Sequence, residues 1–357
     1  MPPLARLPLL ILGFLGLFAG TGAGLARLGW SVPDLAASAS SLHGPLMVCG
    51  FFGVVISLER AVAIGRLWAY AGSLLAGLGG IAAVAGAATV APWLFLFGSI
   101  ALLAATVDIF RRQTEWFTFT LTLGALCWST GNALWAGGAT VHAVVPWWLA
   151  FLILTIAGER LELSRFLPPS PAAGRVFATI LAAITVGLLG AAAAWGIEVF
   201  AGGLVALSLW LGKQDIARRT VRNKGLTRFI AVCLLSGYAW LAVGGAVIIA
   251  AGGLVPGSPS YDAALHALTL GFVFAMVFGH APIIFPAVLR VAVPYHPTFY
   301  LPLALLHLSL VVRLAGDATA RFDWTKVGGM LNALALAAFI ASTASAVVRG
   351  KRRAKPA

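Results

Sequence analysis

The chain has few charges and few cysteines. Only 10% of its 357 residues are charged, 11 of them acidic, whereas 61% are hydrophobic. The cysteines Cys49, Cys127 and Cys233 lie in apolar runs without CxxC spacing, a pattern typical of small buried side chains and not of a disulfide framework. No long polar stretch remains for a soluble domain. These absences predict a single integral membrane domain over residues 1–357.

Apolar runs recur along the whole chain, and each is long enough for a membrane-spanning helix. Such a helix needs about 20 apolar residues to cross the hydrocarbon core. The predicted fold is therefore all-α and polytopic, and the first apolar run is kept as a helix because it has no convincing cleavage site. We predict twelve spans, at 8–27, 42–62, 68–88, 92–110, 116–136, 140–160, 174–194, 196–212, 229–252, 263–286, 297–315 and 327–348.

The net charge of +13 is spread unevenly among the connections between these spans. With a cytoplasmic N-terminus, all but four of the 24 basic residues fall on the cytoplasmic side. The four exceptions are Arg27, Arg313, Arg321 and Lys326. This bias follows the positive-inside rule and predicts both termini in the cytoplasm. It makes the lipid bilayer the expected environment and argues against nucleic acid as a partner.

Three predicted spans begin with a histidine. His43, His142 and His266 open the second, sixth and tenth spans, so the chain is predicted to hold three four-helix units near 1–113, 114–225 and 226–357. An imidazole in hydrocarbon is costly and usually faces a protein interior, a cavity or a cofactor. We expect the three imidazoles to share one layer near the outer face of the membrane.

The opposite ends of these three helices also carry ionisable groups. The second and sixth end in Glu59-Arg60 and Glu159-Arg160, most simply ion pairs at the cytoplasmic interface; a proton path through either Glu is the alternative. The tenth has His280 instead, 14 residues after His266. In a regular α-helix these two histidines share a face about 21 Å apart, which is too far for one metal ion.

An intramembrane imidazole can ligate a metal or haem iron, relay protons or hydrogen-bond a neighbouring helix. Hydrogen bonding is the usual role of a single membrane histidine, but three at one level favour ligation. His43 and His266 are candidate axial haem ligands, and His142 a candidate ligand of copper or a second haem. His280 and His307 are candidates for a deeper site.

Two neighbours of the candidate haem ligands have open roles. Met47, four residues after His43, is a candidate contact to a macrocycle, although simple packing is the alternative. Asp262, one turn before His266, either accepts the second N–H of that imidazole or serves as an acid at a helix N-terminus.

Two of these stretches resemble the NnrS family of membrane proteins. Residues 43–51 (HGPLMVCGF) are similar to the H-x-x-x-M-x-x-G-F portion of that family, and residues 265–271 (LHALTLG) to its L-H-A-L-T-x-G stretch. Gly279-His280 resembles its Gly-His pair, whereas Pro45 and Leu46 stand where the family has His and Glu. The resemblance implies twelve spans, haem and copper, and a link to nitric oxide metabolism.

The placement of histidines on helices two, six and ten also resembles subunit I of haem–copper oxidases and nitric oxide reductases. In those proteins helices two and ten supply haem ligands, and helix six supplies a copper ligand. The resemblance implies redox chemistry, nitric oxide metabolism or gas sensing in a bacterial inner membrane, with a cytochrome or quinone as electron donor.

The residues leave a second function open, a twelve-span transporter for a metal ion or a proton-coupled solute. In that interpretation His43, His142 and His266 line the pathway, and Glu59 and Glu159 gate its cytoplasmic end. Whether the protein is an enzyme is open in both interpretations.

Overall fold

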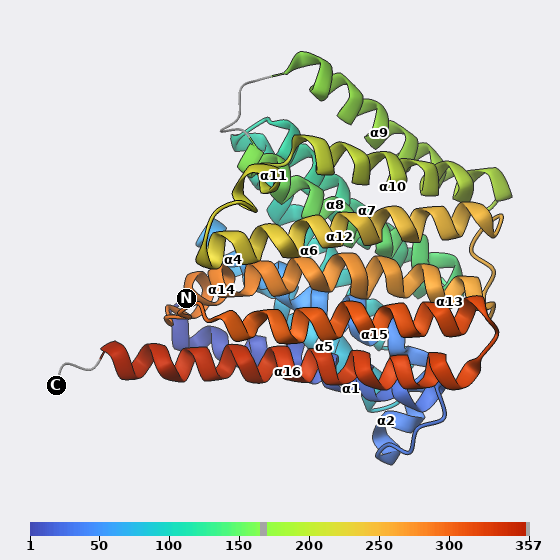
Figure 1. The fold of residues 1–357 in the computed structure, drawn as a ribbon, viewed down its shortest axis with the longest axis horizontal. Coiled ribbons are helices and arrows are strands. Elements are labelled where there is room, and N and C mark those ends of the chain that lie inside the picture. The colour runs from blue at the N-terminus through green and yellow to red at the C-terminus, as the bar shows by residue number, and fades with distance from the viewer. Residues whose placement is uncertain (165–169, 355–357) are drawn as a thin grey trace. The chain divides into compact units, whose positions relative to one another are not determined.

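The computed structural model describes residues 1–164 and 170–354 (Figure 1), and within these ranges the chain contains helices and no strand. Two segments, η3 and η5, are π-helical, and the other η elements are 3₁₀-helices. The elements up to residue 164 are η1 (Pro3–Arg6), α1 (Leu7–Arg27), α2 (Asp34–Ser38), η2 (Ser40–Leu42), α3 (His43–Pro45), η3 (Leu46–Phe52), α4 (Gly53–Ile64), η4 (Leu67–Tyr70), α5 (Ala71–Val84), α6 (Ala91–Arg112), α7 (Trp116–Ala136) and α8 (Val141–Ser164). The later elements are α9 (Pro171–Leu189), α10 (Ala194–Gln214), α11 (Ala217–Thr220), α12 (Gly225–Ala250), α13 (Pro259–His266), η5 (Ala267–Phe274), α14 (Ala275–Leu289), η6 (Pro297–Phe299), α15 (Tyr300–Ala318) and α16 (Phe322–Ala354).

The helices agree with the predicted membrane spans. Among the described residues, eleven helical stretches are long and apolar enough to cross a membrane. They cover every predicted span except 116–136, where α7 is a 21-residue helix with several threonines and a central asparagine. The protein is therefore a multi-pass membrane protein, as predicted.

Two of the three predicted histidine helices are not regular α-helices. The second passes from α3 at His43 into π-helical η3 and then into α4. The tenth passes from α13, which ends at His266, into π-helical η5 and then into α14. The sixth, α8, is α-helical from its first residue.

The π-helical segment changes one prediction about the tenth helix. The expectation that His266 and His280 share a face assumes 3.6 residues per turn throughout. A π turn bonds residue i to residue i+5 and so takes in an extra residue, which rotates all that follows by about 100° relative to an α-helix. Because η5 lies between the two histidines, the assumption of one shared face is wrong.

The chain divides into two compact units. Unit 1 holds Met1–Glu159 and Ala287–Arg290, and unit 2 holds Arg160–Pro286 and Val291–Ala357. The division thus falls inside α8, whereas the three four-helix units predicted from the histidines remain a prediction.

Each unit has its own order of packing. In unit 1, α1 packs against η3 and α5, α5 packs against α6, and α6 packs against α7. In unit 2 the helices follow one another as neighbours in chain order, from α9 and α10 through α12, α13 and η5 to α15 and α16 (Figure 1).

Glycines on α1 let the second histidine helix come close. A Cβ added at Gly16 would lie 2.7 Å from the carbonyl carbon of Gly50, and one at Gly20 would lie 2.8 Å from Sδ of Met47. Small residues four apart allow such close contact between membrane helices. The glycine stripe of α1 therefore packs directly against π-helical η3.

Candidate functional site

His43 is held by α1 in unit 1. Its half-buried ring donates a hydrogen bond from Nδ1 to the carbonyl oxygen of Gly20 at 2.7 Å. A Cβ added at Gly24 would lie 2.8 Å from the ring, so this glycine makes room for the imidazole. Because a carbonyl oxygen only accepts, the ring proton is on Nδ1, and in the neutral imidazole Nε2 carries the lone pair.

His266 has the same protonation in unit 2. Its Nδ1 donates to the backbone carbonyl oxygen of Asp262 at 2.8 Å and lies 3.3 Å from Oδ1 of the same residue. Histidines that bind metals usually donate their second N–H to a carbonyl or carboxylate in this way. Asp262 is thus the partner that the sequence suggested for His266, through its backbone as well as its side chain.

The carboxylate of Asp262 has a second and closer partner. Arg313 of α15 donates from Nε to Oδ2 at 2.7 Å and from Nη2 to Oδ1 at 2.8 Å. In the sequence Arg313 stands out only as an exception to the charge bias. An arginine within an otherwise apolar helix requires a polar partner, and that is the feature that could have predicted its ion pair.

A second carboxyl group lies one turn after Arg313. Oδ1 of Asp317 accepts a hydrogen bond from Oγ1 of Thr325 at 2.9 Å. Its Oδ2 is buried and has no hydrogen-bond partner among residues 1–164 and 170–354. Helices α13 and α15 of unit 2 thus gather one imidazole, one guanidinium and two carboxyl groups, and α16 adds the hydroxyl of Thr325.

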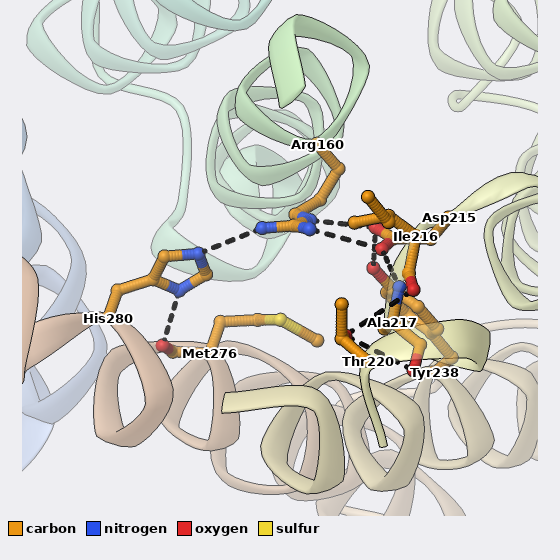
Figure 2. Close-up of polar contacts among 8 residues, drawn as sticks. All are labelled: Arg160, Asp215, Ile216, Ala217, Thr220, Tyr238, Met276 and His280. Carbon is orange, nitrogen blue, oxygen red and sulfur yellow. Dashed lines mark hydrogen bonds and ion pairs between the residues drawn. The ribbon is translucent and has the colours of Figure 1, made fainter. Parts of the chain in front are cut away.

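His280 belongs to a separate polar cluster in unit 2 (Figure 2). Its Nδ1 donates to the carbonyl oxygen of Met276 at 2.7 Å, and its Nε2 lies 3.3 Å from Nη1 of Arg160. A guanidinium only donates, so Nε2 accepts this bond and the imidazole is neutral. Figure 2 shows Arg160 between His280 and Asp215.

Asp215 is the centre of this cluster. Arg160 donates to it from Nε at 2.7 Å and from Nη2 at 3.0 Å. Tyr238 donates its hydroxyl at 2.7 Å, and the backbone N–H of Ala217 donates at 2.7 Å. Arg160 is 3% exposed and Asp215 is 5% exposed, so this is a buried ion pair. Asp215 is not among the site residues predicted from the sequence. Its one distinguishing feature there is that it is the single acid in the basic stretch 213–228.

The glutamates predicted at the helix ends lie in unit 1. Glu159 forms an ion pair with Arg60 at 2.7 Å, so it bonds to the arginine of the other Glu-Arg motif. Glu59 is partly exposed on α4. A proton path through either glutamate remains a prediction.

The other candidates differ in their surroundings. Nδ1 of His307 accepts a hydrogen bond from Nε1 of Trp240 at 3.0 Å, and Nε2 donates to Oγ of Ser236 at 2.9 Å. Both ring nitrogens therefore link α15 to α12. His142 is exposed at the start of α8, and Met47 packs against Gly20.

The candidate ligands among the described residues are single histidines and not clusters. In the part of the chain that the structure describes, no group of three or more His, Cys, Asp or Glu could hold a metal ion. A haem iron needs only one or two axial ligands from the protein, because the macrocycle provides the others. Single histidines with a fixed Nδ1–H, such as His43 and His266, meet that need.

One family model matches nearly the whole chain. The model of a family described as a domain of unknown function, DUF8744, matches residues 6–348. The chain belongs to the DUF8744 family. No curated protein matches it. The DUF8744 match includes both π-helical segments and all six histidines of the chain.

Proposed function

We propose that this protein binds haem, with Nε2 of His43 in unit 1 and Nε2 of His266 in unit 2 each a candidate axial ligand, and that it acts in redox chemistry, nitric oxide metabolism or sensing of a small diatomic gas. One observation carries the proposal. Both imidazoles donate Nδ1–H to a backbone carbonyl, and both stand at the entry to a π-helical segment.

Each part of this observation has a physical reason. An N–H bond to a carbonyl holds the ring in one tautomer and raises the basicity of the opposite nitrogen. A π-helical segment interrupts the i→i+4 ladder and is frequent at functional sites. A bound haem would supply an iron that binds diatomic gases and exchanges electrons with a cytochrome or quinone. Met47 of η3, four residues after His43, would contact the macrocycle.

His142 is the candidate that we keep for copper. His280 and His307 both use their two ring nitrogens in hydrogen bonds to protein groups, so ligation by either would break one of these bonds. His142 is exposed at the first turn of α8, where its side chain is accessible to an added ion.

The proposal includes twelve spans, with α7 as the twelfth. The polar side chains of α7 are satisfied within the protein, as spanning helices require. Thr120 and Thr122 donate to carbonyls of their own helix, and Asn132 donates to the carbonyl of Phe95 and accepts from Trp148. An even count would put both termini on the same side of the membrane, and the distribution of basic residues supports the cytoplasmic side of a bacterial inner membrane.

A transporter is the second candidate function, and the cluster around Asp317 favours it. Ionisable residues inside spans often mark the path of an ion or a proton. Oδ2 of Asp317 is buried and has no hydrogen-bond partner among the described residues. On the neighbouring helix α13, Asp262 contacts both His266 and Arg313.

Absorption spectra of the purified protein test the haem proposal. We expect a Soret band in wild type, oxidised and reduced, and its loss or a shift in His43→Ala and in His266→Ala. His307→Ala is the matched control, because it also removes a half-buried intramembrane imidazole but is expected to keep the band.

A colourless wild type, expressed with haem in excess, would contradict the proposal. The transporter would then be tested by uptake of metal ions or protons into proteoliposomes, with Asp317→Asn as the variant expected to fail.

A further inference from the structure

The connection between α10 and α12 exposes an unusual number of positive charges. Every basic side chain in residues 213–228 is exposed, and the stretch contains a single acid, Asp215. The basic residues are Lys213, Arg218, Arg219, Arg222, Lys224 and Arg228. We refer to them as the basic connection.

The fold removes Asp215 from this surface. The carboxylate accepts two hydrogen bonds from Arg160, one from Tyr238 and one from the backbone N–H of Ala217 (Figure 2). Arg160 therefore neutralises Asp215 in the interior of unit 2. As a result, no exposed acid offsets the positive charges of the basic connection.

The basic connection also lies where helices leave the apolar part of a membrane. It joins the ends of two helices that are each long and apolar enough to span. Trp210, one turn before it, donates from Nε1 to the carbonyl oxygen of Ala173 on α9, which places exposed Arg175 at the same end. Tryptophans and basic residues together are typical of the headgroup level.

The basic connection is held close to the helix ends. Arg218 donates from Nη1 to the carbonyl oxygen of Lys213 at 2.8 Å, and Asp215 bonds the first N–H of α11. Its arginines are consequently presented at the depth of lipid phosphates, which guanidinium groups bind in bidentate fashion.

We propose that the basic connection, together with Arg175, binds the headgroups of anionic phospholipids in the surrounding membrane. The chemistry recognised is the phosphodiester, and the source is the lipid, since the side chains are tethered at headgroup depth. Each basic side chain near an anionic lipid surface contributes about fivefold to association. This inference does not depend on haem binding.

Native mass spectrometry of the full-length protein in detergent, titrated with phosphatidylglycerol or phosphatidylcholine, tests the proposal. Arg218→Gln, Arg219→Gln and Arg222→Gln in one chain should raise the apparent Kd for phosphatidylglycerol on the order of 100-fold. The control with Arg27→Gln, Arg66→Gln and Arg111→Gln removes the same charge from separate exposed sites of unit 1 and should raise it less than the clustered variant does.

A second variant adds a charge instead of removing contacts. Asn223 is exposed, and Asn223→Glu should raise the Kd for phosphatidylglycerol about fivefold. Wild-type Kd values in both the triple variant and Asn223→Glu would overturn the proposal. So would displacement of phosphatidylglycerol by an equal concentration of inorganic phosphate, because that result indicates a site for a soluble anion.

Discussion

At the scale of single residues, hydrogen bonds fix the ring tautomer of several histidines. His43, His266 and His280 all donate from Nδ1 to a backbone carbonyl, and Nε2 of His280 accepts from a guanidinium. His307 has the opposite tautomer, because Trp240 donates to its Nδ1. Identical side chains thus differ in their chemistry, which one or two neighbours set in each case.

Asp262 distinguishes His266 from His43, and its charge can be removed with little change of shape. In the haem-bound protein that we propose, a carboxylate near Nδ1 would make His266 a stronger donor to iron and so favour the oxidised form. We therefore expect Asp262→Asn to raise the haem reduction potential by on the order of 59 mV, the equivalent of a tenfold change. Potentiometric titration measures this, and Asp323→Asn, an exposed acid of α16, should leave the potential unchanged.

The buried pair of Arg160 and Asp215 makes a prediction about stability. Arg160→Gln leaves the carboxylate of Asp215 buried without its counter-charge, so the free energy of unfolding should fall by about 3–5 kcal/mol. Arg218→Gln, which removes an exposed guanidinium of the same unit, should change it by less than about 0.5 kcal/mol. Thermal unfolding in detergent compares the two, and equal stability would show that the pair contributes nothing.

At the scale of elements, the distinctive feature is the π-helical segment after His43 and after His266. Each packs against a neighbour at short range. Gly16 of α1 lies against the backbone at Gly50 of η3, and Gly271 of η5 lies directly against Trp240 of α12. Helices α1 and α12 therefore pack closely against the two irregular segments.

The contact between α1 and η3 is testable with two glycine substitutions. Gly16→Ala places a Cβ 2.7 Å from the backbone of Gly50, which cannot move aside, so stability should fall by about 1–3 kcal/mol. Gly202→Ala, a control in α10 of unit 2, meets no atom within 4 Å outside its chain neighbours and should be neutral or gain up to about 1 kcal/mol from helix propensity. Unfolding curves for the two proteins decide the matter; a neutral Gly16→Ala would mean that η3 can shift.

At the scale of the whole molecule, the open question is whether α7 crosses the membrane. Its polar side chains bond to carbonyls and to other side chains of unit 1, which makes a crossing compatible with hydrocarbon. If it crosses, the connections before and after it lie on opposite sides.

Labelling with a membrane-impermeant maleimide tests this topology. Gln113→Cys and Thr140→Cys flank α7 at exposed positions, and the native cysteines are buried and should react little. We expect the two new thiols to be labelled from opposite sides of sealed vesicles. Labelling from one side only would leave eleven spans and place the two termini on opposite sides of the membrane.

The sequence by itself determined the class of protein and the position of nearly every helix. Hydrophobicity is a local property that adds up along a stretch of chain, so apolar runs predicted the spans without knowledge of their neighbours. It also singled out His43 and His266, because an imidazole in an apolar run is conspicuous wherever it lies. Only α7 is less apolar than the other predicted spans, because it contains threonines and an asparagine whose polar groups bond within the protein.

The tertiary structure alone decided the partners. Asp215 reads in the sequence as one charge in a basic loop, and Arg313 as an isolated cation, until helix packing brings them to Arg160 and Asp262. The π-helical segments likewise pack against residues distant in the chain, η3 against Gly16 and η5 against Trp240. Such pairings join residues 51 and 55 positions apart, and a pattern read along the chain carries no information on which helix faces meet.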